Sequence, residues 1–448
     1  MHRSLCYQLM KTSDRSPAKR RLRAARIAFW IGATLLVVAG PAAAQLRLPS
    51  VGLSTLPRLP SPAVQGTLQQ AVPLLDLRVS AERDLLRRYP DRIEPDPSGH
   101  PVRRGELLWL APSPQARQSA LAQGFTVLRE QDLPELGLRQ LVMRAPEGEV
   151  IAAAAQRLRV IEPDAAVDFN HLYLPGGDLG GGEAAASAPV RGLPRRVGLI
   201  DGGVDRHHAA FAQARIQGFG CGGRELPSAH GTAVASLLVG RDGAFAGVQP
   251  AAELFAADVY CDQPDGGAAE DVARALAWMV RERVPVINIS LVGPTNILMA
   301  KATQAVMRQG HLVVAAVGND GPAAPALYPA SYPGVVGVTG VAPSRRVLPE
   351  AGQGPQVILA APGSELAAAR SGGGYAAVRG TSFAAPIVAG LLAEVLSQPD
   401  TQAAAVALER LERAATDLGE PGRDNVFGYG LVGESSRTPP DRVAARRP

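Results

Sequence analysis

The region from residue 191 to 432 alternates short apolar runs with helical stretches, and this pattern limits the fold more than any other feature. The runs RRVGLID, AELFAADVY, VPVINISL and HLVVAAVGN are rich in β-branched residues and almost continuously hydrophobic. Strands of a parallel sheet have this composition because helices cover both of their faces. Helical patterns such as residues 268–283 separate the runs. The region is therefore predicted to be an α/β domain with a mainly parallel sheet and helices on both faces.

A second, smaller domain is expected at residues 105–174. Strand-like and helix-like segments follow one another there in the order β-α-β-β-α-β, which is the ferredoxin-like arrangement of an α+β domain. Glycine-rich residues 175–190 predict a flexible linker that proteases can cut. Pro-punctuated residues 45–104 predict a loosely ordered leader with one amphipathic helix, and residues 433–448 predict a disordered tail.

The N-terminus has the features of a secretory signal peptide. A basic stretch that ends at Arg26 precedes the apolar run of residues 27–40, and Ala42 and Ala44 fit a small-residue cleavage site. A run of 14 apolar residues is short for a bilayer span, so a signal at residues 1–44 is favoured over a permanent anchor. We therefore expect a secreted or periplasmic protein with no membrane span after cleavage.

Charge and cysteine content narrow the class of protein. The chain has a net charge of +5, but residues 1–44 contribute +7, so the rest sums to −2 and offers no basic surface for nucleic acid. Cys6 leaves with the signal, and Cys221 and Cys261 remain as a pair in an oxidising compartment. We expect a disulfide between them; two buried free thiols are the alternative.

Four polar residues stand where parallel sheets place their working groups, at the carboxyl ends of strands or the amino ends of helices. Asp201 and Asn319 end two of the apolar runs, whereas His230 and Ser382 open helical stretches. Singly, each fits a turn or a helix N-cap. Together they supply an acyl-transfer site: a nucleophile, a base, a carboxylate that orients the base, and a donor for the oxyanion.

Ser382 suits this chemistry through its position in the stretch RGTSFAAPIVAG. A residue in the first turn of a helix has a backbone N–H without an intrahelical acceptor and lies at the positive end of the helix dipole. Ser382 is therefore expected to supply both the attacking oxygen and a second oxyanion donor beside Asn319.

The order Asp201, His230, Ser382 resembles the subtilase family of serine peptidases. The stretches VGLIDGGVD, HGTAVASLLVG, INISLVG, VVAAVGNDG and GTSFAAPIVAG carry this resemblance. It implies a serine endopeptidase in which Asp201 orients the general base His230, Ser382 is the nucleophile and Asn319 binds the oxyanion. An extended peptide is expected to add as a strand along the cleft. The substrate-binding residues that the resemblance implies are Ser290, Leu291, Val292, Ala316 and Gly318.

The same resemblance suggests a role for residues 105–174. Their element order is similar to that of the inhibitory propeptides of these enzymes, which implies a domain that assists folding, occupies the cleft and is cut off in or before the linker. The expected partners are therefore protein or peptide substrates and the chain's own propeptide. No carboxylate cluster has recognisable calcium-ligand spacing, so no cofactor or metal is predicted and calcium is left open.

Two positions depart from the family pattern. Gly202 stands where Ser or Thr usually follows the aspartate, which predicts looser surroundings of that carboxylate. Val292 stands where the cleft strand usually has Gly, which predicts a narrowed primary pocket. Two alternatives to a secreted endopeptidase therefore stay open: a catalytically impaired peptide-binding protein on the same fold, and a peptide ligase or cyclase that resolves the same acyl-enzyme with an amine.

Overall fold

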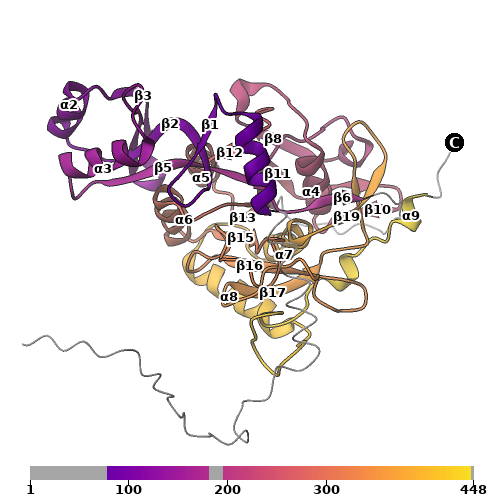
Figure 1. Ribbon diagram of the computed structural model, residues 1–448. Coiled ribbons are helices and arrows are strands. Elements are labelled where there is room, and N and C mark those ends of the chain that lie inside the picture. Colours follow the sequence, from indigo (N-terminus) through magenta and orange to yellow (C-terminus); the bar gives the residue numbers. More distant parts are fainter. Residues whose placement is uncertain (1–77, 181–194, 445–448) are drawn as a thin grey trace, which may run out of the picture. The chain divides into compact units, whose positions relative to one another are not determined.

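The structure is a computed structural model that describes residues 78–180 and 195–444 (Figure 1). These residues fall within one unit, Pro60–Pro448. The signal peptide expected at residues 1–44 lies outside the described residues. In the part of the chain that the structure describes, no helix is long and apolar enough to span a bilayer.

The smaller domain is an antiparallel sheet with two helices on one face. Its four main strands lie in the order β5–β2–β4–β3, the ferredoxin-like topology that the sequence predicts. Trp109 and Leu158 lie in the core that the sheet shares with the helices. The elements are β1 (Ile93–Pro95), β2 (Pro101–Leu110), α2 (Pro114–Ala122), β3 (Thr126–Leu133), η1 (Pro134–Leu136), β4 (Leu138–Arg144), α3 (Ile151–Ile161) and β5 (Ala166–Pro175).

Order begins earlier than the expected boundary at residue 105. Residues 78–88 are helical, and β1 pairs with β2, whose first residue is Pro101. Leu85 and Leu86 of the helix pack against the buried side chains of Ile93 and Leu172. The proline spacing therefore underestimates the order of the leader, because its amphipathic helix has an apolar surface of the small domain to cover.

The larger domain is built on a seven-stranded parallel sheet, in the order β17–β16–β15–β13–β7–β11–β8 (Figure 1). This confirms the predicted α/β class. One core cluster packs α4 and α7 on the sheet, and a second packs α5 and α6 on it. The main elements are β7 (Arg196–Asp201), β8 (Arg215–Phe219), α4 (Ala229–Val239), β11 (Glu253–Asp258), α5 (Ala269–Arg281), β13 (Val286–Ile289), α6 (Ile297–Arg308), β15 (Leu312–Ala316), β16 (Val336–Val341), β17 (Val357–Pro362), α7 (Thr381–Val395) and α8 (Thr401–Ala414).

Both predicted flexible segments are partly ordered. After β5, residues 178–180 form β6 (Asp178–Gly180), which pairs with β19 (Tyr375–Arg379), the partner of β18 (Leu366–Ala369). The rest of the expected linker, up to residue 190, lies outside the described residues. The expected disordered tail instead forms η4 (Glu434–Ser436) and α9 (Asp441–Ala444).

The tail is held because its backbone and side chains find partners on the larger domain. The Ala367 N–H donates to the Thr438 carbonyl at 2.8 Å, and the Arg437 guanidinium donates to the Val341 carbonyl at 3.2 Å. Polar composition alone therefore gave the wrong expectation for residues 433–444.

The sheet of the small domain lies against α5 and α6 through its other face. Leu108 and Val142 of that sheet belong to the same hydrophobic cluster as Leu276 and Met299 of the two helices. Polar contacts surround this cluster; one of them joins Arg129 of β3 to Glu270 at the start of α5. The two domains therefore share a core as well as a chain connection.

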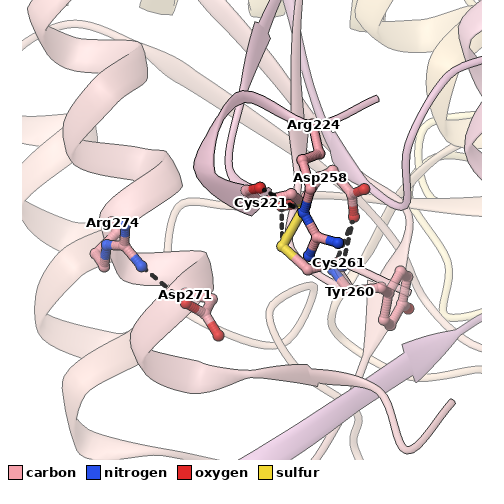
Figure 2. Close-up of a disulfide and its surroundings, with 7 residues drawn as sticks. All are labelled: Cys221, Arg224, Asp258, Tyr260, Cys261, Asp271 and Arg274. Atoms are coloured by element: carbon pink, nitrogen blue, oxygen red, sulfur yellow. Dashed lines mark hydrogen bonds and ion pairs between the residues drawn. A yellow bond between two sulfur atoms is a disulfide. The ribbon is translucent and has the colours of Figure 1, made fainter. Parts of the chain in front are cut away.

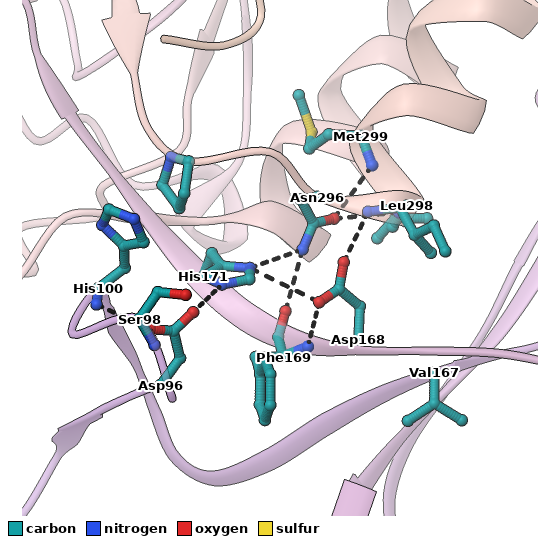
Figure 3. A network of polar contacts seen from close by, with 12 residues as sticks. Asp96, Ser98, His100, Val167, Asp168, Phe169, His171, Asn296, Leu298 and Met299 are labelled. Carbon is teal, nitrogen blue, oxygen red and sulfur yellow. Dashed lines mark hydrogen bonds and ion pairs between the residues drawn. The ribbon is translucent and has the colours of Figure 1, made fainter. Parts of the chain in front are cut away.

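At the amino end of α6, polar side chains of the small domain form hydrogen bonds with the larger domain (Figure 3). The first N–H groups of a helix lack intrahelical acceptors. Asn296 caps two of them with Oδ1, and the Asp168 carboxylate of β5 accepts the Ile297 N–H at 2.7 Å. The Asn296 Nδ2 donates to His171 Nδ1 at 3.0 Å, and His171 Nε2 lies 3.1 Å from Asp96. Small-domain residues thus complete a helix of the larger domain.

Cys221 and Cys261 form a disulfide, with Cα atoms 5.0 Å apart (Figure 2). Cys221 follows β8 and Cys261 follows β11, the strand that also pairs with β7. The Asp258 carboxylate at the end of β11 accepts the N–H groups of Tyr260 and Cys261 at 2.9 Å. The bridge therefore ties together two loops at the carboxyl edge of the sheet.

Replacing both cysteines with Ser is expected to lower the free energy of unfolding by about 2–4 kcal/mol, because the bridge restricts the unfolded chain. The crosslink closes a loop of 40 residues. Urea unfolding should show a lower midpoint for the double variant, and reductant should shift the unmodified protein by the same amount. An unchanged midpoint would show that the bridge carries no stability.

Candidate active site

Asp201 and His230 form a buried pair at the carboxyl edge of the sheet. Asp201 is the last residue of β7 and is fully buried, and His230 lies in the first turn of α4. The His230 Nδ1 lies 2.9 Å from both carboxylate oxygens, so the carboxylate fixes Nδ1 as the protonated nitrogen. The Gly202 N–H also donates to Asp201, at 2.7 Å. The base therefore presents Nε2 as its free acceptor.

The structure gives a reason for glycine at position 202. A Cβ there would lie 2.4 Å from the Ser228 Oγ, so Ser228 already fills the space of a larger residue. That Oγ accepts the Gly231 N–H at 2.9 Å and so caps α4, the helix that carries His230. The Asp201 carboxylate is enclosed, and the looser surroundings expected from Gly202 are not found.

Ser382 lies in the first turn of α7, fully buried, as the sequence predicts. Its Oγ donates to the Ser290 carbonyl at 3.1 Å. The His230 Nε2 is buried and has no hydrogen-bond partner in the described structure. The ring of His230 lies 5.3 Å from that of Phe383, the residue next to Ser382. The Ser382 hydroxyl and the His230 Nε2 are therefore not hydrogen-bonded to each other in the described structure.

Asn319 lies beside the start of α7 and has an open amide nitrogen. Its Oδ1 accepts the Thr381 N–H at 3.0 Å, which leaves the amide nitrogen pointing the other way. That Nδ2 is buried without a partner. A buried amide donor left open is costly unless a ligand uses it. Two of the open polar atoms at this site, the His230 Nε2 and the Asn319 Nδ2, are of the kinds that acyl transfer uses: an acceptor for a proton and a donor for an oxyanion.

The cleft beside Ser382 holds the end of the small domain. Strand β5 pairs antiparallel with β14 (Leu291–Val292) on one side and with β12 (Gly267–Ala268) on the other. The next residue, Gly176, donates its N–H to the Ser290 carbonyl at 3.4 Å. A Cβ on Gly176 would lie 2.8 Å from the Ser382 Oγ and 3.8 Å from the Asn319 Nδ2. The chain therefore passes through the site.

The predicted substrate-binding residues divide into two groups. Ser290, Leu291 and Val292 bond or pair with the chain in the cleft. Val292 also borders the space beside Gly176, because its Cγ1 would be in ordinary van der Waals contact, at 3.6 Å, with a Cβ there. Ala316, the last residue of β15, is buried, and the Gly318 N–H donates to the Thr381 hydroxyl. Neither residue is among those that pair with β5.

Sequence reasoning missed the charged residues around the cleft. Asp320, Glu350 and Arg379 line the cavity beside Gly176, together with Arg78 from the leader helix. The motif could have indicated Asp320, because this residue directly follows Asn319. Arg78 had no local signal, because its neighbourhood depends on the packing of the leader.

One group among the described residues has the spacing of metal ligands: Cys221, Asp258 and Cys261. Its two sulfur atoms are bonded to each other, so they are not available as thiolate ligands. The structure therefore gives no reason to place a metal at that group.

The fold and the site agree with the comparison to known proteins. The model of the subtilase family matches residues 195–430, which is more than half of the chain. The chain therefore belongs to the subtilase family, and the resemblance seen in the motifs is confirmed.

Its relatives include the subtilisins of Bacillus. It is 32% identical over 249 residues to subtilisin E of Bacillus subtilis, covering 52% of this chain and 62% of the relative. It is 31% identical over 251 residues to the subtilisin of Bacillus pumilus, covering 53% of this chain and 88% of the relative. The crystal structure of fervidolysin from Fervidobacterium pennivorans has a similar fold, with a TM-score of 0.62 and 20% identity over 78% of this chain and 62% of that one.

Proposed function

We propose that this protein is a secreted serine endopeptidase that is made as an autoinhibited precursor. The buried Asp201–His230 pair, the first-turn position of Ser382 and the open Asn319 amide support the chemistry. The signal-like N-terminus supports export. The observation that carries the proposal is the chain in the cleft, which lies against Ser382 in the manner of a substrate.

The proposed reaction begins when the Ser382 Oγ turns from the Ser290 carbonyl to the His230 Nε2. Nε2 takes the hydroxyl proton as the oxygen attacks the peptide carbonyl, and Asp201 stabilises the imidazolium that forms. The oxyanion accepts hydrogen bonds from the Asn319 Nδ2 and from the first-turn N–H of Ser382. His230 then protonates the leaving amine, and water hydrolyses the acyl-enzyme by the same steps in reverse.

The register of the chain supports one bond as the first to be cut, Gly176–Gly177. The N–H of Gly176 is held by Ser290 on the strand side of the cleft. The Gly176 carbonyl oxygen lies 3.1 Å from where a Cβ of Gly380 would be, and the Asn319 Nδ2 lies 3.0 Å from that same position. The Gly176 carbonyl and the Asn319 amide therefore flank the same point before α7, which supports Gly176 as the acyl donor and Gly177 as the leaving amine.

The mature protein is expected to begin at Gly177, as read by intact mass and N-terminal sequencing of the exported protein. Gly177→Val should slow this cut at least about tenfold, because a Cβ there would lie 2.8 Å from the Phe383 ring and 3.3 Å from the Arg379 carbonyl. Ala153→Val, at an exposed position of α3, creates the same side chain away from the cleft and should leave cutting unchanged. A stable product that begins at Gln45 would contradict the precursor model.

A further inference from the structure

The chain in the cleft is anchored to the larger domain on both sides of the Gly176–Gly177 bond. Before this bond, β5 pairs with β12 and β14. After it, β6 pairs antiparallel with β19 in three residue pairs, and the pair nearest the bond joins Asp178 to Arg379 (Figure 1). None of these strand pairs includes Gly176 or Gly177. Cutting the bond would therefore leave both of its ends paired with the larger domain.

The amino side of the bond is held by the whole small domain. The Asn296 Nδ2 donates to the Phe169 carbonyl of β5 at 3.0 Å. The Arg103 guanidinium of β2 lies 3.1 Å from the carboxylate of Asp265, which is fully buried in the loop before β12. Departure of the small domain would take the cation away from this carboxylate, which is costly for a buried charge. The end at Gly176 would therefore be firmly held after a cut.

The carboxyl side of the bond is held by its own tether. The chain continues from Gly180 to β7, which begins at Arg196. Three residue pairs alone would bind weakly, but a short tether presents a segment to its binding place at an effective concentration of about a millimolar. The new amino terminus at Gly177 would therefore stay in the cleft.

The two ends are held in a site to which water has poor access. Ser382 is fully buried, and Gly176 is buried beside it. The separation of two products normally favours hydrolysis, because each of them gains translational and rotational freedom. Here both ends stay in place, so that gain is withheld, and the amine of Gly177 is positioned to react with the acyl-enzyme.

We propose that this peptidase also rejoins the bond it cuts, so that the precursor is a balance of cut and uncut chain until the small domain dissociates. The Ser382 Oγ attacks the protonated carboxyl group of Gly176, and the carboxyl hydroxyl leaves as water. The neutral amine of Gly177 then attacks the ester carbonyl and forms the amide, while His230 takes a proton from the amine and gives it to the departing Ser382 Oγ. The inference rests on the proposed function, since it is the reverse of the same reaction.

The test uses the full chain, purified as the precursor and kept at high concentration so that the fragments stay together. It is incubated in water enriched in the heavy oxygen isotope until the ratio of cut to uncut chain is constant. The uncut chain is then isolated under denaturing conditions, and mass spectrometry of a peptide that spans the bond reads the isotope in the Gly176 carbonyl. Because only hydrolysis followed by rejoining brings solvent oxygen into that carbonyl, we expect uncut chain to persist and its label to rise toward that of the solvent. Ser382→Ala should stay uncut and unlabelled.

Two double variants test the part played by β6. Leu179→Pro with Gly180→Pro leaves the residues next to the bond unchanged. Neighbouring residues of a strand direct their N–H groups to opposite sides, so one of the two prolines removes a donor to β19. We expect the constant ratio of uncut to cut chain to fall about three- to tenfold, because the cut end can then leave the cleft. Leu179→Ala with Gly180→Ala keeps both N–H groups, so this matched control should stay within about twofold of the unmodified protein.

Each outcome decides between the inference and the proposed function. Complete conversion to cut chain would overturn the inference and leave the proposed function intact. Uncut chain that stays unlabelled beside cut chain would overturn it in the same way. An unchanged ratio in the proline variant would also overturn it, because the pairing of β6 would then not hold the reacting end. A chain that is never cut would contradict the proposed function and this inference with it.

Discussion

Replacing Ser382 with Ala is expected to abolish labelling by a fluorophosphonate probe and to lower peptide hydrolysis about a millionfold, the loss known for a subtilisin triad. The effect is large because the side chain supplies the attacking atom, and the groups around it act as a unit. Asn319 can still polarise the carbonyl group of a peptide bound in the cleft, so a small residual rate above water should remain. Mass spectrometry of the labelled protein should place the probe on Ser382 alone.

The same variant separates activity from folding. Its precursor should remain uncut at Gly177 and should unfold in urea at the same midpoint as precursor captured before cutting, because Ser382 is replaced by a smaller residue at a helix start. Ser435→Ala, which removes a hydroxyl from an exposed position of η4, is the control and should retain labelling. Folded, processed protein that does not label would favour the catalytically impaired peptide-binding alternative.

Asp201→Asn is expected to lower kcat about ten-thousandfold with little change in fold, the size known for this change in a Ser-His-Asp peptidase. Both carboxylate oxygens lie 2.9 Å from the His230 Nδ1, so they accept its proton and direct Nε2 toward the serine. An amide at this place can donate to Nδ1, which would stabilise the tautomer with the proton on Nε2. The base would then have no lone pair for the serine proton. Steady-state kinetics on one peptide gives the comparison.

Asp258→Asn is the matched control for that change. Asp258 lies directly opposite Asp201 in the adjacent strand, yet its carboxylate binds backbone N–H groups of its own loop. An Asn side chain keeps an oxygen for those bonds, so activity should stay close to that of the unmodified protein. A similar loss of kcat in both variants would show that Asp201→Asn disturbs the edge of the sheet and does not act through the tautomer of His230.

The sequence predicted the site best where a polar residue stands at the end of a strand or at the start of a helix. Asp201 and Asn319 end apolar runs and Ser382 opens one, so parallel-sheet geometry alone places them on one edge. The order of elements in the small domain could also be predicted, because its strands and helices have different hydrophobic periods. Both folds follow from local pattern plus a topological rule.

Contacts between segments that are distant in the sequence could not be predicted from it. The Ser228 side chain that fills the space beside Gly202 comes from another loop, and no local pattern announces it. The leader looks loosely ordered because prolines interrupt it, and the tail looks disordered because its composition is polar, but each is held by a surface built elsewhere in the chain. The pairing of Arg78 with Asp320 joins residues more than two hundred positions apart.

The hydrophobic cluster shared by Leu108, Val142, Leu276 and Met299 has a consequence for timing. In the proposed precursor, cutting the chain would remove a covalent link but none of these contacts, so the two fragments would remain a complex with its own dissociation constant. Inhibition would be independent of concentration before the cut. Afterwards it would obey mass action, and dilution or destruction of the small fragment would set the amount of free enzyme. Onset of activity would then have a concentration-independent first phase and a slower second phase that dilution accelerates.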